Sequence, residues 1–226
     1  MADDEAILPL FIWLSPAFPV GSFAYSHGCE SVIEAGDIKS NDDLRHWLEA
    51  SLRFGSARTD ALLLAQAWHA QHQSKVDVVH ELNELALALA PSSERYLETS
   101  AQGYAFVRAL KESWPCPPLM DFAETHETIA YPIALAIASA HYKCPIDMSL
   151  NMFLIAFINN IVSACVRLGP IGQTEAQKIL AWAVPLIKIQ STEIITLSIE
   201  DLGSSTLRFD LASLQHETLY SRLFRS

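Results

Sequence analysis

The chain has 226 residues and a formal net charge of −11, with 50% hydrophobic and 18% charged residues. A disordered chain would be poor in apolar residues and rich in charge, so this composition predicts a folded protein. Binding to nucleic-acid phosphates requires a positive field, which an acidic chain does not supply, so nucleic acid is excluded as a main partner. The length suits a single domain, which we expect to cover residues 1–226.

The cysteines and the start of the chain favour the cytoplasm. The four cysteines form no C-x-x-C pair and are too few for a disulfide scaffold, so we expect reduced thiols. A signal peptide opens with basic residues, whereas this chain opens with acidic ones. The uncharged stretch 148–166 is long enough to cross a bilayer, but its serines and asparagines favour a buried helix. We therefore expect a soluble cytoplasmic protein that does not enter a membrane.

The beginning of the chain contains few helix signals until residue 40. We expect a disordered start at 1–6, and three prolines should break any continuous helix near the N-terminus: Pro9, Pro16 and Pro19. Ser40 and Asp43 then form a capping pattern ahead of an apolar stripe with helical spacing. The first regular helix is therefore expected to begin at this pair.

Helical periodicity continues through most of the remaining chain. We expect caps at Thr59 or Asp60, at Ser92 or Ser93, and at Thr174. The expected helices cover 59–73, 76–90, 92–114, 122–142, 147–168, 174–182 or beyond, and 192–202. Residues 203–206 suggest a linker into a terminal segment, 203–226. The fold class predicted is all-α, a single-domain bundle of roughly eight to ten helices with a C-terminal tail.

Details inside these helices lead to further expectations. Pro132 either starts or kinks its helix, and Pro185 kinks the helix that contains it. A glycine within a helix is costly, so Gly103 indicates a close helix contact. The core candidates of the 92–114 helix are Tyr96, Leu97, Phe106, Val107 and Leu110.

Signatures of catalysis are missing from the sequence. There is no phosphate-binding GxxxxGK[ST] loop and no GxSxG nucleophile elbow. Three His-Glu pairs occur, but a zinc protease helix needs a second histidine one turn later. Those positions hold Glu84, Ala130 and Tyr220. The chain is therefore not expected to be an enzyme, nor to carry a cofactor.

A histidine pair, a histidine–cysteine pair and an asparagine pair require separate consideration. His69 with His72, and His27 with Cys29, could contact a transition metal. A solvated helix face and a buried pair without metal explain them better, so we expect no metal site. At least one residue of 159–160 should be buried and hydrogen-bonded to neighbouring helices, with a catalytic amide as the weaker alternative.

Three segments do not resemble ordinary core: 15–30, 167–177 and 216–226. In the first, two prolines and two glycines surround aromatic residues, which predicts either a rigid turn that presents Phe23 and Tyr25 or a simple buried loop. In the second, Gly and Pro force a sharp reversal, after which Gln173 and Gln177 share one helix face. The alternative there is an interhelical turn with a polar rim.

The third segment, the tail 216–226, combines aromatic and aliphatic residues with arginines. Tyr220, Leu223 and Phe224 stand beside Arg222 and Arg225, a composition typical of binding hot spots. Such a segment could become ordered on a partner, with its arginines paired to carboxylates. Docking of the tail on its own domain is the alternative.

Together these segments resemble a known family. They read SPAFPVGSFAYSHGCE at 15–30, PIGQTEAQ at 170–177 and HETLYSRLFRS at 216–226. The urease accessory protein F family carries similar motifs in the same order: SPALPVGGFSYSxGLE, PLGQxxGQ and HExxxSRLFRS. The resemblance covers essentially the whole chain. The departures from the family pattern are Ser22, Cys29, Ile171 and Ala176.

This resemblance implies a non-enzymatic all-α homodimer that acts in urease maturation. Such a protein binds the D-type accessory protein, also called H-type, and recruits the G-type GTPase. The complex delivers nickel into apo-urease when GTP is hydrolysed, and only through that transfer would His27 or Cys29 lie near metal. The resemblance implies that the D-type partner docks on the tail through His216, Glu217, Tyr220, Arg222, Leu223, Phe224 and Arg225. It also implies that the GTPase-facing dimer surface includes Tyr25, Ser26, Glu30, Gln173 and Gln177.

Two alternatives remain open beside this hypothesis. An all-α enzyme could use a buried carboxylate or histidine, and it would require several such groups to meet in one cleft. The protein could also bind nickel tightly itself, without passing it between partners.

Overall fold

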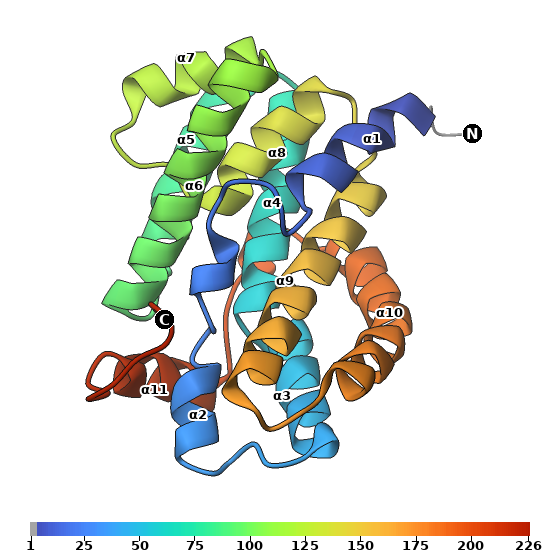
Figure 1. The fold of residues 1–226 in the computed structure, drawn as a ribbon. Coiled ribbons are helices and arrows are strands. Elements are labelled where there is room, and N and C mark those ends of the chain that lie inside the picture. Colours follow the sequence, from blue (N-terminus) through green and yellow to red (C-terminus); the bar gives the residue numbers. More distant parts are fainter. Residues whose placement is uncertain (1–3) are drawn as a thin grey trace.

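A computed structural model describes residues 4–226 of the chain, and these residues form helices and loops without a strand (Figure 1). The α-helices are α1 (Asp4–Trp13), α2 (Cys29–Glu34), α3 (Asn41–Phe54), α4 (Ser56–His72), α5 (Val76–Ala88), α6 (Ser93–Ser113), α7 (Pro117–Thr125), α8 (Tyr131–His141), α9 (Ile146–Leu168), α10 (Gln173–Ile194) and α11 (Leu207–His216). Two short 3-10 helices are η1 (Ser22–Ala24) and η2 (Ile199–Asp201). The prediction of an all-α fold is confirmed.

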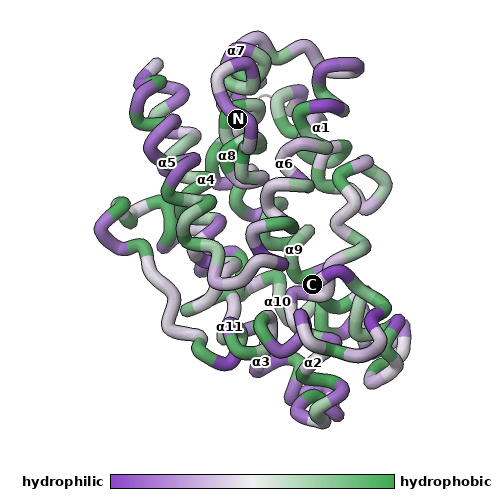
Figure 2. Tube along the Cα trace, turned by 90° about the vertical axis from the view of Figure 1, so that its left-hand side faces the viewer, coloured by the Kyte–Doolittle hydropathy of each residue, from purple (hydrophilic) through white to green (hydrophobic). Residues whose placement is uncertain are grey.

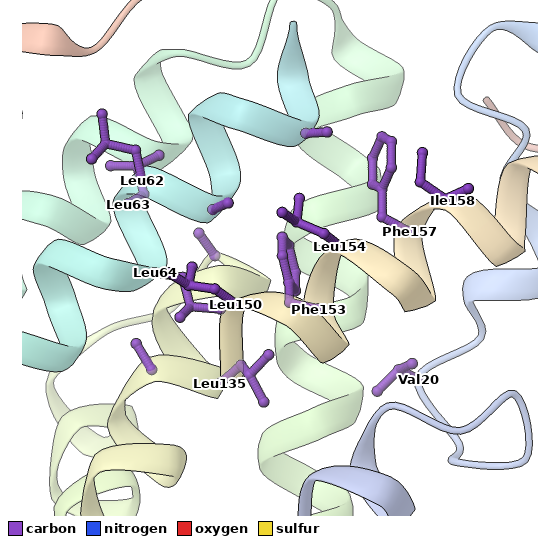
Figure 3. Close-up of a cluster of buried hydrophobic side chains, with 14 of the residues drawn as sticks. Val20, Leu62, Leu63, Leu64, Leu135, Leu150, Phe153, Leu154, Phe157 and Ile158 are labelled. Carbon is purple, nitrogen blue, oxygen red and sulfur yellow. The ribbon is translucent and has the colours of Figure 1, made fainter. Parts of the chain in front are cut away.

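Helix α4 lies at the centre of the bundle, packed against α3, α5, α8 and α9. Its Leu64 lies beside Leu150 of α9, and Leu154 follows one turn farther along α9 (Figure 3); all three side chains are fully buried. Burial of each such side chain contributes about 1.5–3 kcal/mol. The facing sides of α4 and α8 are rich in alanine, which lets these two helices approach closely. One continuous apolar core results. On the outer helix α5, hydrophobic and hydrophilic residues alternate along the chain (Figure 2).

Several helix starts follow the capping expectations, and others do not. Ser40 and Asp43 form a reciprocal capping box at α3, and the Ser92 hydroxyl accepts from the Arg95 backbone N–H at the start of α6. In contrast, α4 starts before Thr59 and α10 starts before Thr174, because Gly55 and Gly172 occupy the two cap positions. Pro132 lies in the first turn of α8 and so starts that helix.

The N-terminal expectation was wrong at residues 4–6 and at Pro9, whereas Pro16 and Pro19 lie outside any helix, as expected. Residues 4–6 belong to α1, which contains Pro9, while residues 1–3 lie outside the described part of the chain. Pro9 lies in the second turn of α1, where its missing N–H leaves the Glu5 carbonyl without its helical donor, and the helix nevertheless continues to Trp13.

The C-terminal helices also differ from expectation. Helix α10 continues past Pro185 to Ile194, so no separate helix spans 192–202. After α10, Ser198 and Asp201 form a capping box of their own, which starts η2. Helix α11 then lies within the stretch expected to be linker and tail.

The expected core residues of α6 are confirmed in part. Phe106 and Leu110 are fully buried and Val107 is partly buried, whereas Tyr96 and Leu97 are exposed, contrary to expectation. A Cβ atom on Gly103 would lie 1.9 Å from the Ile129 carbonyl oxygen. The close contact expected at Gly103 is therefore confirmed, and its partner is the segment before α8.

Helix α9 has the length and apolar composition of a membrane span, but 56% of that window is buried inside the domain. This agrees with the expectation of a buried helix. Asn159 and Asn160 are half-buried rather than buried. Asn160 donates to the Tyr25 carbonyl oxygen at 2.9 Å, so it bridges α9 to the N-terminal loop rather than to a neighbouring helix.

Candidate functional site

The three unusual segments meet at one end of the bundle, where α2, α11 and the turn between α9 and α10 lie close to one another (Figure 1). The Ser26 hydroxyl donates to the Ser226 carbonyl oxygen at 2.6 Å, and the Arg225 backbone N–H donates to Ala24 at 2.7 Å. The Arg167 guanidinium lies 4.2 Å from the centre of the Phe224 ring. We call this region the tail junction, and it comprises Ser26, Glu30, Glu94, Glu98, Arg167 and residues 216–226.

Glu30 anchors the tail backbone. Its Oε1 accepts from the Leu223 N–H at 2.7 Å, and its Oε2 accepts from the Phe224 N–H at 3.0 Å. The preceding Gly28 has a left-handed φ of 75° and takes α2 so close to α11 that a Cβ there would lie 3.1 Å from the Ala212 Cβ. Glycine at this position therefore brings the Glu30 carboxylate within reach of the tail.

His216, at the end of α11, lies between two carboxylates. It is fully buried, with Nδ1 2.8 Å from Glu94 Oε2 and Nε2 3.0 Å from Glu30 Oε2. Arg222 reaches the other oxygen of Glu94 at 2.7 Å. The Glu217 carboxylate accepts from the Ser93 hydroxyl at 2.6 Å, and this bond lowers the Glu217 pKa. These contacts fasten the tail to α2 and α6.

A second buried ion cluster adjoins the tail junction. Arg95 contacts Glu98 at 2.7 Å and Asp60 at 3.0 Å, and it donates to His27 Nδ1 at 3.1 Å. Burial lowers the pKa of His27 to about 4, so its imidazole is neutral near pH 7. Burial raises the pKa of Asp60. Burial also acts to raise the pKa of Glu98, but the positive charge of Arg95 outweighs it, so the Glu98 pKa is lowered. The Ser226 hydroxyl donates to Glu98 at 3.0 Å, which ties the cluster to the tail.

A cavity of about 280 Å³ opens beside this cluster. Its polar lining includes His27, Asp60, Arg95, Glu98, Asn160 and Arg167. Carboxylates and an imidazole thus do meet in one cleft, as the enzyme alternative requires. Arg95 pairs with both carboxylates, however, so each is already engaged as a structural ion partner. The arrangement suits a rigid support for the tail better than acid–base chemistry.

The predicted partner-binding residues differ in their exposure. The buried ones are Tyr25, Ser26, Glu30, His216 and Phe224, and the half-buried one is Glu217. The exposed ones are Gln173, Gln177, Tyr220, Arg222, Leu223 and Arg225. The first segment therefore presents Phe23, which is 65% exposed, but Tyr25 points inward, contrary to the rigid-turn expectation.

Sequence reasoning missed the α6 side of the tail junction. Glu94 and Glu98 hold His216, Arg222 and Ser226, yet none of the motifs includes them. Their i, i+4 spacing places both carboxylates on one helix face, but acidic residues in a first helical turn are usually solvated. Only the buried partners, which are distant in sequence, reveal their role.

The described residues contain no group of three or more His, Cys, Asp or Glu side chains placed to hold a metal ion. A hydrogen bond with Cys165, together with burial, raises the Cys29 pKa well above its ordinary value, so Cys29 stays a thiol rather than a metal-binding thiolate. His72 stacks on Trp68 with ring centres 5.0 Å apart. The alternative of tight nickel binding therefore has no support in this geometry.

Comparison with known proteins identifies the family. A family model described as UreF matches residues 38–183. The urease accessory protein UreF of Xanthobacter autotrophicus (strain Py2) is 45% identical over 98% of this chain and 91% of its own length. The protein of the same name from Bradyrhizobium sp. (strain BTAi1) is 44% identical over 99% of this chain and 93% of its own length. That of Rhodopseudomonas palustris (strain TIE-1) is 45% identical over 98% of this chain and 92% of its own length. All three are named as accessory proteins rather than enzymes, and the chain belongs to the UreF family of urease accessory proteins.

Proposed function

We propose that this protein is a scaffold in urease maturation. It links the D-type (H-type) accessory protein to the G-type GTPase, and the complex inserts nickel into apo-urease with GTP hydrolysis. Within this complex the scaffold acts in the cytoplasm as a homodimer of single-domain chains, and nickel is the cargo rather than a resident cofactor. Membership of the UreF family supports this role, and so does the engagement of the buried charged groups with one another rather than with a ligand.

The observation that carries the proposal is the division of the tail. Phe224 and Ser226 are buried and fix the tail backbone, while Tyr220 is fully exposed and Leu223 is 64% exposed. Exposed tyrosine and leucine on an anchored backbone bind with a small entropic cost, because the backbone is already ordered. We propose that Tyr220 and Leu223 contact the D-type partner directly, while His216 and Phe224 position them.

Deletion of residues 216–226 tests the tail. We expect the truncated chain to keep α1 to α10, because those helices share the apolar core, and to lose co-purification with the D-type protein. Circular dichroism and a pull-down measure the two effects. Unchanged co-purification would refute the role of the tail.

Because the deletion also removes buried groups, a variant confined to exposed side chains is needed. Tyr220→Ala combined with Leu223→Ala leaves the buried anchors in place and should still abolish the D-type complex. Val184→Ala, at a 53% exposed position on α10, is the matched control and should bind normally. Equal binding by both variants would remove Tyr220 and Leu223 from the interface.

For the GTPase, we propose a surface that includes Gln173 and Gln177. Both side chains are exposed at the start of α10, next to the turn that follows Arg167. Tyr25, Ser26 and Glu30 then act on this surface indirectly, by holding the tail. Alanine at both glutamines should reduce GTPase recruitment and leave D-type binding intact. Normal recruitment by this double variant would contradict the assignment.

A further inference from the structure

The contacts of His216 require one more proton than a neutral imidazole and two carboxylates can supply. Both of its ring nitrogens lie within hydrogen-bond distance of a carboxylate oxygen, at 2.8 Å to Glu94 and 3.0 Å to Glu30. A neutral imidazole has one N–H, so it can donate to only one of the two carboxylates. The lone pair on its other nitrogen would then face the lone pairs of the second carboxylate oxygen, which is a repulsive contact. Both contacts are favourable only when an additional proton is present.

This count does not depend on where the proton sits. The proton can make His216 an imidazolium that donates to both carboxylates, or it can reside on one carboxyl, which then donates to the neutral ring. Either arrangement holds one proton more than neutral His216 with ionised Glu30 and Glu94. All three side chains are buried, so water does not replace the missing donor easily.

The surrounding charges make this proton favourable. Glu30 faces His216 from α2 and Glu94 faces it from α6, while Arg222 of the tail contacts Glu94 alone. Farther along α6, Glu98 is paired with Arg95. With the extra proton, the four groups Glu30, Glu94, His216 and Arg222 are neutral in sum, whereas without it they carry one uncompensated negative charge in a buried site.

We infer that docking of the tail on its own domain takes up one proton, so that the tail is held by a pH-dependent latch. When the released tail does not already hold this proton, docking must take it from solution. The equilibrium constant for docking therefore falls as the pH rises between pH 6 and pH 9, by up to tenfold per pH unit.

Other groups at the tail junction do not account for such a change. His27 has a pKa of about 4 and is already neutral over this range, and burial raises the Tyr25 pKa above its ordinary value near 10. This inference rests on the proposed function in one respect. Only if the docked tail carries the D-type contact does the latch regulate partner binding.

Amide hydrogen exchange of the isolated full-length chain tests the latch without any partner. The reporters are the Phe224 and Arg225 amides, which donate to Glu30 and to Ala24 in the docked tail. Each rate is divided by the intrinsic chemical rate at the same pH to give a protection factor. We expect protection of both amides to fall as the pH rises from 6 to 9, by up to tenfold per pH unit.

Glu94→Gln identifies the proton. Its amide N–H can donate to a neutral His216, which then donates to Glu30, while the amide oxygen still accepts from Arg222. Docking of this variant needs no additional proton, so protection should stay constant with pH. Glu217→Gln, a change at the neighbouring carboxylate, should keep the wild-type slope.

The outcomes separate clearly. A flat wild-type profile overturns the inference, and so does a Glu94→Gln profile as steep as that of the wild type. A Glu94→Gln variant without protection even at pH 6 also counts against it, because the glutamine should satisfy every contact. None of these results bears on whether the D-type protein binds the tail, so this inference and the proposed function can fail separately.

Discussion

The interior around α4 and the tail junction are both buried, but they are built from opposite chemistry. Around α4, leucine and alanine side chains from successive helices pack by shape (Figure 3). At the tail junction, charged and hydroxyl groups join residues far apart in sequence, and one hydrogen bond connects Ser26 with Ser226, 200 positions away. The first kind of contact tolerates substitutions that conserve volume, whereas the second depends on each donor and acceptor.

This difference separates contacts that do not respond to pH from contacts that can. Apolar packing around α4 does not change with pH and holds the bundle together. The tail junction contains many ionisable groups for its size, so its contacts respond to protonation and to competing partners. A segment held in this way can be released while the rest of the fold stays intact.

The largest expected effect on stability lies in the apolar core. Leu64→Ala removes a fully buried side chain between α4, α8 and α9, and should lower the free energy of unfolding by about 2–5 kcal/mol. Leu211→Ala, at a 45% exposed position on α11, should change it by less than about 0.5 kcal/mol. Chemical denaturation measures both values. A similar cost for the two variants would contradict the assigned core.

The next effect concerns His27 and pH. The His27 pKa falls from 6.5 to about 4 in the folded chain, so below pH 6.5 the unfolded chain binds a proton that the folded chain does not. This term therefore favours folding fully above pH 6.5 and is lost as the pH falls toward 4. On going from pH 7 to pH 5, protonation of His27 in the unfolded chain should lower the free energy of unfolding of the wild type by about 2 kcal/mol.

His27→Asn removes this titration while suiting the left-handed backbone, where φ is 54°. The difference in unfolding free energy between wild type and variant, measured by denaturation at both pH values, should therefore shift by about 2 kcal/mol. Parallel pH profiles for the two proteins would mean that His27 is not held neutral.

A smaller effect is expected for Ser26→Ala. The Ser26 hydroxyl donates to Ser226 and accepts from the Glu30 N–H, so its loss should weaken tail docking by about 1–2 kcal/mol. Protection of the Arg225 amide should fall about five- to thirtyfold. Ser221→Ala, at an exposed tail position, should leave that protection unchanged. If both variants behave alike, the Ser26–Ser226 contact does not hold the tail.

Much of this structure could be predicted from local sequence, because helix periodicity and caps depend on near neighbours. The capping box at Ser40 and the close approach at Gly103 were both predicted in this way. Motifs also indicated the three segments that form the tail junction. Glu94 could not be identified, because its role depends on His216 and Arg222, more than one hundred residues away. Tyr25 was misjudged for the same reason: a tail distant in sequence helps to bury it.

The smallest expected effect on stability is also the most direct test of the account. Tyr220→Ala with Leu223→Ala should change the free energy of unfolding by less than about 0.5 kcal/mol, since both side chains are exposed. The measurement that decides the central claim is the affinity of this double variant for the purified D-type accessory protein. A loss of at least about thirtyfold, as expected for a hot-spot pair, would support a docked tail that presents these residues to the partner. Wild-type affinity would contradict it.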